Sequence, residues 1–375
     1  MFWLRSRFLN TSGLRSYTIS DYSLERKIAL RKRYFNLTFA SVVSAIAVVY
    51  MHVNSSVFQT SDVTRAGWLS AHFMISVCYF AVPVFFMITG ATLMDYRERY
   101  STKTYFFQRV KKTVIPFFIW SIVALLFQIQ MGTIDPSTLS EFEIFKGIFS
   151  AEYLSIYWFF LNLFCLYLLI PVLSLIPKEN RMDIFLYVLV VSFVLELFVP
   201  FLNAAFGLDI PKRIRMHLGT DSYFFLFAGY YLQNKELKKK HRYMLYAAGI
   251  AGFLIQFIGT WKLSVTAGKP VETLRGSAMM PNALYSIAIF VLLKQIAEKI
   301  DENSRIANIC KFLSGYTFGI YLIHRYLMLL MERQTLIPAW HIVYRVLTPG
   351  IFIAVCIGLI WLIRKIPIFG EWIVP

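Results

Sequence analysis

Charged residues, acidic ones above all, are scarce in this sequence. Asp, Glu, Lys and Arg make up 16% of the 375 residues, against about 25% in soluble proteins. Apolar residues reach 58%, where roughly 45–50% is usual. These figures exclude an ordinary soluble enzyme and predict an integral membrane protein. The net charge of +17 is then typical of loops that face anionic lipid, and nucleic-acid binding is not expected.

Other absences narrow the function further. The four cysteines are scattered through apolar stretches, which excludes a zinc ribbon or a disulfide framework. The sequence has no GxSxG, HExxH, GxxxxGK[ST] or GxGxxG motif, so soluble hydrolases, zinc proteases and ATP-driven pumps lose their usual support, and no metal site is expected. The basic residues 1–34 contain no apolar run, which argues against a cleavable signal peptide.

Long apolar runs are abundant and predict an all-α bundle of about ten transmembrane helices. The runs lie near residues 35–54, 71–94, 112–131, 157–176, 183–203, 217–233, 243–262, 281–297, 312–332 and 342–363, and the sixth is the weakest. With both termini in the cytoplasm, 27 of the 38 Lys and Arg residues fall on inner segments, as the positive-inside rule requires. We therefore expect a cytoplasmic tail (1–34), one membrane domain (35–366) and a short C-terminal tail (367–375) in the cell membrane.

Ionisable side chains inside the spans are candidates for function because they are costly there. His52 lies near the outer end of the first span and tops a stripe of mostly small side chains that includes Ser41, eleven residues earlier. His324 lies in the ninth span, with Tyr321 on the same helix face. Each histidine fits a general base or a structural hydrogen bond, and the spacing alone does not decide between them.

Two groups of cations suggest ligand contacts. Arg109, Lys111 and Lys112 come at the start of the third span, where they fit the phosphates of an anionic cofactor or simple positive-inside topology. A second group, Arg213, Arg215 and His217, falls on the outer side against the positive-inside trend, which fits an anionic or sugar acceptor or lipid headgroups. Glu196, inside the fifth span, is expected to pair or to be protonated.

Six segments taken together resemble the membrane-bound acyltransferase 3 family, which includes O-acetyltransferases of bacterial surface glycans. They are AVVYMHVN with His52, AVPVFFMITGATL, FFQRVKKTVIPFFIW, YWFFLNLFCLYLLIP, YFFLFAGYYL and SGYTFGIYLIH, in the order that the family shows. The resemblance covers residues 35–340. It implies a bundle of about ten helices that passes an acyl group, usually acetyl, from cytoplasmic acyl-CoA to a hydroxyl of an extracytoplasmic glycan.

Under this resemblance His52 is the expected general base, and acyl-CoA, a surface polysaccharide and membrane lipids are the expected partners. Arg109, Lys111 and Lys112 are then expected to bind acyl-CoA, and Arg213, Arg215 and His217 to contact the acceptor. The family typically carries an arginine where this chain has Ser41. That departure keeps a second hypothesis open, namely a glycan or lipid-linked sugar transporter without acyl-transfer chemistry, and a third, a structural subunit of a polysaccharide assembly complex. The sequence does not indicate the oligomeric state.

Overall fold

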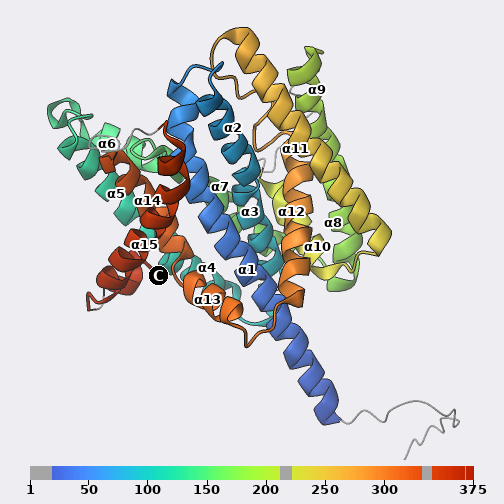
Figure 1. The fold of residues 1–375 in the computed structure, drawn as a ribbon. Coiled ribbons are helices and arrows are strands. Elements are labelled where there is room, and N and C mark those ends of the chain that lie inside the picture. The colour runs from blue at the N-terminus through green and yellow to red at the C-terminus, as the bar shows by residue number, and fades with distance from the viewer. Residues whose placement is uncertain (1–18, 212–221, 332–339, 368) are drawn as a thin grey trace, which may run out of the picture.

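The computed structural model describes residues 19–211, 222–331, 340–367 and 369–375, and over these residues the chain is built of helices without a strand (Figure 1). The predicted all-α class is therefore confirmed. The α-helices are α1 (Ile19–Thr60), α2 (Ala66–Cys78), α3 (Ala81–Leu93), α4 (Thr102–Arg109), α5 (Ile115–Gln130), α6 (Glu141–Phe149), α7 (Trp158–Leu173), α8 (Lys178–Ser192), α9 (Val199–Phe206), α10 (Tyr223–Asn234), α11 (Lys239–Ala267), α12 (Met280–Lys299), α13 (Arg305–Ser314), α14 (Thr317–Met331), α15 (Ile342–Arg364) and α16 (Gly370–Ile373).

Eight described helical segments are long and apolar enough to cross a membrane, and the bent pair α13–α14 is a ninth candidate. The ninth predicted span therefore differs from the structure, because its helix breaks after Ser314 and turns by 67°. The sixth predicted span lies partly outside the described residues. Its described part, α10, has 12 residues, fewer than the roughly 20 that a span needs.

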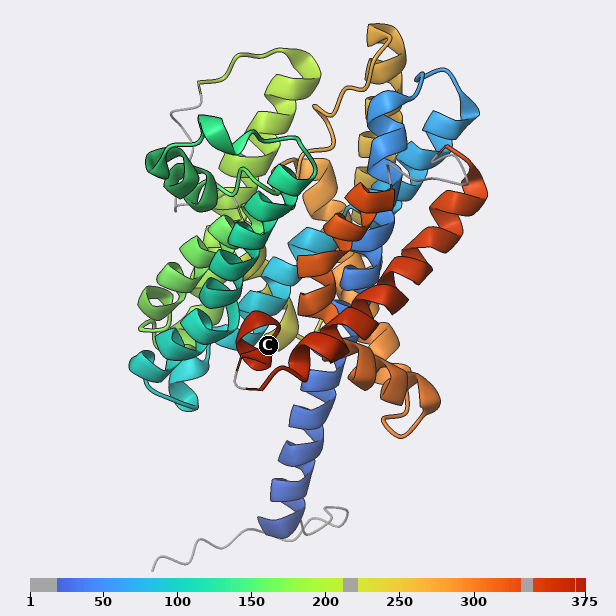
Figure 2. The same ribbon diagram turned by 90° about the vertical axis from the view of Figure 1, so that its left-hand side faces the viewer.

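The long helix α1 runs through the bundle and defines its two ends. It begins at Ile19, inside the predicted tail, and its first turns project from one end (Figure 2). We call this end, which also carries α4, α13 and the connection between α10 and α11, the basic end. The final helix α16 lies toward the same end in both views. Further along, α1 packs against α2, α3, α12, α14 and α15, so any side chain in its middle faces the interior of the protein.

Two glycines allow α3 and α10 to cross almost backbone to backbone. A Cβ atom on Gly90 would lie 1.9 Å from the carbonyl oxygen of Leu226, and one on Gly229 would lie 1.9 Å from that of Met87. Close contact between helices at small residues is the usual way to gain packing energy in a membrane, where water does not drive association. This crossing holds α10 inside the bundle and buries nearly every residue of α10.

Prolines interrupt several helices, and the neighbouring chain compensates. A π-helical segment precedes Pro116 (Val110–Val114) and another precedes Pro200 (Phe193–Phe198). In α7, Pro171 lacks the N–H that would bond the carbonyl of Tyr167. The hydroxyl of Tyr105, on α4, donates to that carbonyl at 3.1 Å. The freed backbone group is therefore used to tie α4 to α7.

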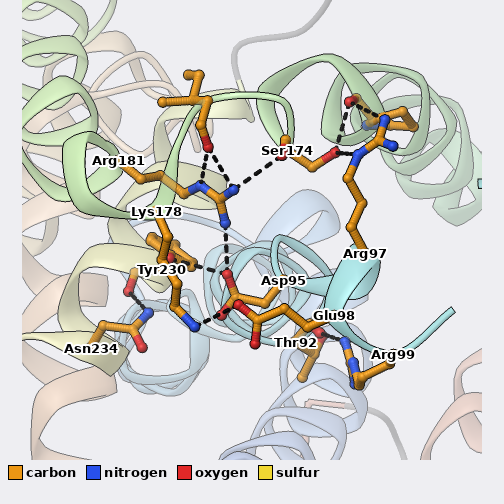
Figure 3. A network of polar contacts seen from close by, with 12 residues as sticks. Thr92, Asp95, Arg97, Glu98, Arg99, Ser174, Lys178, Arg181, Tyr230 and Asn234 are labelled. Atoms are coloured by element: carbon orange, nitrogen blue, oxygen red, sulfur yellow. Dashed lines mark hydrogen bonds and ion pairs between the residues drawn. The ribbon is translucent and has the colours of Figure 1, made fainter. Parts of the chain in front are cut away.

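A buried ion pair joins four helices at the basic end (Figure 3). Arg181 of α8 lies 2.7 Å from Asp95, which follows α3, and both side chains are largely buried. The same guanidinium donates to the carbonyls of Ser174 and Ile176 just beyond α7. The hydroxyl of Tyr230, on α10, donates to Asp95 at 3.1 Å. Carbonyls at a helix C-terminus have no partner within the helix. Arg181 therefore caps the C-terminus of α7 and at the same time neutralises the charge of Asp95.

Candidate functional site

Two histidines predicted from separate spans meet in the structure. The imidazole of His52, on α1, and that of His324, on α14, have ring centroids 5.3 Å apart and planes tilted by 36°. His324 is fully buried, whereas His52 is partly exposed. His52 lies 17 residues beyond Phe35, or about 25 Å of helix, toward the end of the bundle opposite the basic end. The pair therefore offers one accessible and one enclosed imidazole.

The hydrogen bonds of His324 define its tautomer. Its Nδ1 lies 2.9 Å from the carbonyl oxygen of Ile320, and since a carbonyl only accepts, Nδ1 donates. In the neutral ring Nε2 is then an acceptor, and this buried atom has no hydrogen-bond partner among the described residues. A buried acceptor without a partner is costly unless a ligand or water supplies a donor.

A cluster of tyrosines fixes the helix that carries His324. Tyr321 has its ring centroid 6.0 Å from that of His324, and its hydroxyl donates to the carbonyl of Ile156. The hydroxyls of Tyr157 and Tyr326 lie 3.1 Å apart, and the latter donates to the carbonyl of Trp120. These bonds connect α14 to α5 and to the start of α7. Tyr321, predicted as a pocket residue, thus lies beside His324 and is committed to a backbone carbonyl.

Two arginines near the site were counted in the sequence only as outer-segment charges. Arg325 follows His324 in the chain and lies within electrostatic reach of both imidazoles. Arg345, on α15, is buried and donates to Asn54 (3.3 Å) and Ser70 (2.7 Å). Asn54 lies two residues beyond His52, so this contact fixes α1 against α15 and α2. The sequence signal was a cation inside an apolar run, but the partners of Arg345 come from two other helices, α1 and α2.

The position that departs from the family pattern lies on the same helix as His52. Ser41 is partly buried in α1, eleven residues closer to the basic end, which is about 16 Å along the helix. One turn further toward His52, Ser44 is fully buried, and its hydroxyl has no partner among the described residues. Ser41 and Ser44 are thus two polar residues in the stripe of mostly small side chains below His52, and the arginine typical of the family is absent from it.

The three cations proposed for the donor have different surroundings. Arg109 ends α4, and its guanidinium lies 5.6–5.9 Å from the ring centroids of Tyr105 and Tyr167. Its Nε is buried without a hydrogen-bond partner among the described residues. Lys111 lies over the ring of Trp372 at 5.0 Å, and Lys112 is exposed. Arg109 is thus the one of the three that is held toward the interior, and it lies toward the basic end, away from the two histidines.

Four further candidate residues were singled out in the sequence. Arg213, Arg215 and His217 fall outside the described residues. Glu196 lies in the π-helical segment Phe193–Phe198, where it is buried and its Oε1 has no hydrogen-bond partner within the described part of the chain. Over the same described ranges, no three His, Cys, Asp or Glu side chains are grouped closely enough to hold a metal ion.

The fold and the site define the class of protein: a polytopic helical membrane protein with two neighbouring histidines in its interior. The chain belongs to the acyltransferase 3 family: the sequence model of that family, described as an acyltransferase domain, matches residues 37–364. The resemblance found in the sequence is thereby confirmed, and membership supports membrane acyltransferase activity in general. Neither a search of curated proteins nor a search of solved structures finds a match to the chain.

Proposed function

We propose that this chain transfers an acyl group, most simply acetyl, from cytoplasmic acyl-CoA to a hydroxyl of an extracytoplasmic surface glycan, with His52 as the general base. The observation that carries the proposal is the partly exposed imidazole of His52 beside the enclosed imidazole of His324, in a chain of an acyltransferase family. A neutral imidazole is suited to removing a hydroxyl proton near neutral pH.

The reaction needs only groups that the site and the substrates supply. His52 accepts the proton of the acceptor hydroxyl while the oxygen attacks the carbonyl carbon of the thioester. The tetrahedral intermediate then collapses with cleavage of the carbon–sulfur bond, and the leaving thiolate takes the proton from the imidazolium. The acceptor leaves as an ester and the donor as free coenzyme A. In this scheme the Nε2 of His324, which lacks a partner within the described residues, accepts a hydrogen bond that orients the acceptor.

The donor side of the proposal rests on Arg109. Its guanidinium lies beside two tyrosine rings toward the basic end, with Nε lacking a hydrogen-bond partner in the described chain. Arginine binds phosphate oxygens in a bidentate manner, so Arg109 suits the phosphates of acyl-CoA. Ser41 and Ser44 lie on α1 on the basic-end side of His52.

The decisive experiment follows labelled acetyl from acetyl-CoA to surface glycan in membranes containing the wild-type chain or His52→Ala. We expect the substitution to reduce transfer by about 10²–10⁴-fold with protein abundance unchanged. His241→Ala is the matched control, because His241 is exposed at the basic end of α11 and should retain full transfer. Intact transfer in His52→Ala would remove His52 from the mechanism.

The serine at position 41, where the family typically has an arginine, favours a second candidate function, a glycan or lipid-linked sugar transporter. If acyl transfer is the activity, Ser41→Arg should lower the KM for acyl-CoA, because it adds a cation on the donor side of His52. Ser41→Met, of similar length but uncharged, should not. Absence of label with folded wild-type protein, together with acyl-CoA-independent movement of a glycan across the membrane, would favour the transporter.

A further inference from the structure

Two neighbouring hollows on α11 and α12 lie away from the histidine pair. One is an apolar groove of about 470 Å³ lined by side chains of α2, α11 and α12, among them Phe73, Tyr246, Ile250, Phe253, Tyr285 and Leu292. The other is a polar pocket of about 210 Å³ at the basic end, lined among others by Lys235, Glu236, Arg242, Lys294 and Glu298. In Figure 1 both helices run side by side toward the basic end.

The groove and the pocket adjoin at Tyr246 and Gln295. Along α11, Tyr246 of the groove lies one turn from Arg242 of the pocket, and along α12, Leu292 of the groove lies three residues before Gln295 of the pocket, on the same helix face. The Tyr246 hydroxyl and the Gln295 amide are 2.9 Å apart, and the Gln295 oxygen accepts from Nε of Arg242 at 2.6 Å in the orientation that satisfies both neighbours. The hydrogen-bonded side chains of Tyr246, Gln295 and Arg242 thus connect the apolar groove with the charged pocket.

The charge around the pocket is positive. Three cations and two carboxylates line it. Lys238, Lys239 and Lys240, all exposed, follow in the adjoining chain. Clusters of this size beside a transmembrane helix are typical of sites for anionic lipid headgroups. The groove is almost wholly apolar and lies on exposed helix surface, with Ile250 61% exposed, so its occupant in a membrane is a hydrocarbon chain.

We propose that the groove and the pocket together bind one anionic glycerophospholipid of the leaflet at the basic end. One acyl chain lies in the groove against Ile250 and Phe253, and the phosphate lies at Lys235 and Arg242. The glycerol region lies at the Tyr246–Gln295 pair, which offers polar groups at that depth. This site is independent of the acyl-transfer proposal, because it uses none of the residues assigned to donor, acceptor or base.

The test is native mass spectrometry of the full detergent-purified chain, titrated with phosphatidylglycerol and with phosphatidylcholine of the same acyl chains. We expect phosphatidylglycerol to bind at least tenfold more tightly. Lys235→Gln should remove most of that preference, whereas Lys103→Gln, at an exposed lysine of α4 that neither lines the pocket nor belongs to the cluster beside it, should retain it. Ile250→Trp should fill the groove and weaken binding of both lipids, with Leu292→Trp as the second groove variant should the first fail to fold.

Leu263→Trp, on the far part of α11 and outside the groove, is the matched control and should leave binding unchanged. Equal affinity for the two lipids would overturn the proposal, as would equal losses in Lys235→Gln and Lys103→Gln, which would indicate diffuse attraction. Displacement of phosphatidylglycerol by inorganic phosphate would show a site for a free anion instead. Unchanged binding in both folded groove variants would also contradict it.

Discussion

At the scale of single residues, His324 is held in one orientation by its surroundings. Its Nδ1 donates to the Ile320 carbonyl of its own helix, and the ring lies between those of His52 and Tyr321. An imidazole that is fixed by one nitrogen presents the other in a defined direction, which is what positioning of a substrate hydroxyl requires. His52, on the accessible side of the pair, is the better placed to take the proton.

We predict that His324→Gln lowers acyl transfer by about 10²-fold with only a small change in Tm, because the glutamine retains a polar group but not the Nε2 acceptor at the same point. The measurement is the initial rate per folded molecule. His72→Gln is the control: His72 is also buried, yet it is stacked on Phe257 and bonded to its carbonyl. The control should lose Tm with little effect on the rate per folded molecule, and equal losses of rate would contradict the assignment.

Sequence reasoning selected His52 on the first span, and His324 with Tyr321 on the ninth, as separate candidates. It did not predict that the two histidines meet, because that contact depends on how α1 and α14 pack. It could not give the contact of Arg345 with Asn54 and Ser70. That contact depends on how α15 crosses α1 and α2, which the local pattern of neither helix encodes. The roles of these residues in catalysis stay predictions.

At the scale of single elements, α3 and α10 cross almost backbone to backbone at Gly90 and Gly229. We predict that Gly90→Ala or Gly229→Ala destabilises the protein by about 3 kcal/mol, because each added Cβ would overlap a backbone carbonyl that cannot move independently. The measurement is Tm and yield in detergent. Gly350→Ala on α15 is the control, since nothing lies within 4 Å of its Cβ position, and a similar loss there would show that the effect is not one of packing.

The short helix α6 depends on a capping box between Ser140 and Glu143. Hydrogen bonds from the Ser140 backbone and hydroxyl lower the pKa of Glu143 from its ordinary value of 4.5. The stabilisation is therefore present above that value and is lost as pH falls through the lowered pKa. We predict faster amide exchange over residues 141–149 at about pH 3 than at about pH 6, after correction for intrinsic rates.

Glu143→Gln is the control for α6, because glutamine also forms a capping box but does not titrate. That variant should show no pH dependence of its corrected exchange. If the corrected exchange depends on pH equally in the wild-type protein and in Glu143→Gln, the change arises from a titratable group other than Glu143.

The sequence predicted most spans, because hydropathy is a local property. It did not predict the bend between α13 and α14, since the apolar run continues through Ser314 and Gly315 while the axis turns by 67°. Nor did it predict the π-helical segments before Pro116 and Pro200. Hydropathy measures the preference for lipid and carries no information on the direction of a helix axis.

At the scale of the whole molecule, Arg181 and Asp95 connect helices far apart in sequence. We predict that Arg181→Met destabilises the protein by about 3–5 kcal/mol, because it removes the guanidinium from a buried carboxylate and uncaps α7. Adding Asp95→Asn should cost less than the sum of the two single changes. Thermal unfolding in detergent measures all three variants.

The exposed pair Lys178–Glu98 provides the control for this prediction. It lies beside the buried pair in Figure 3, with both side chains more than half exposed. Lys178→Met should change stability by less than about 1 kcal/mol. Equal effects of Lys178→Met and Arg181→Met would show that burial does not set the strength of these contacts.

The burial of Asn54 affects how membrane orientation can be measured. Asn54, Ser55 and Ser56 form an N-glycosylation sequon. In the folded protein, however, the Asn54 amide is fully buried, donates to the Tyr50 carbonyl and accepts from Arg345. An oligosaccharyltransferase cannot reach it after folding. A sequon modified only after folding would therefore stay without a glycan whichever side it faces, and for a glycan-tagging map of topology it should be moved to the loop after Thr60.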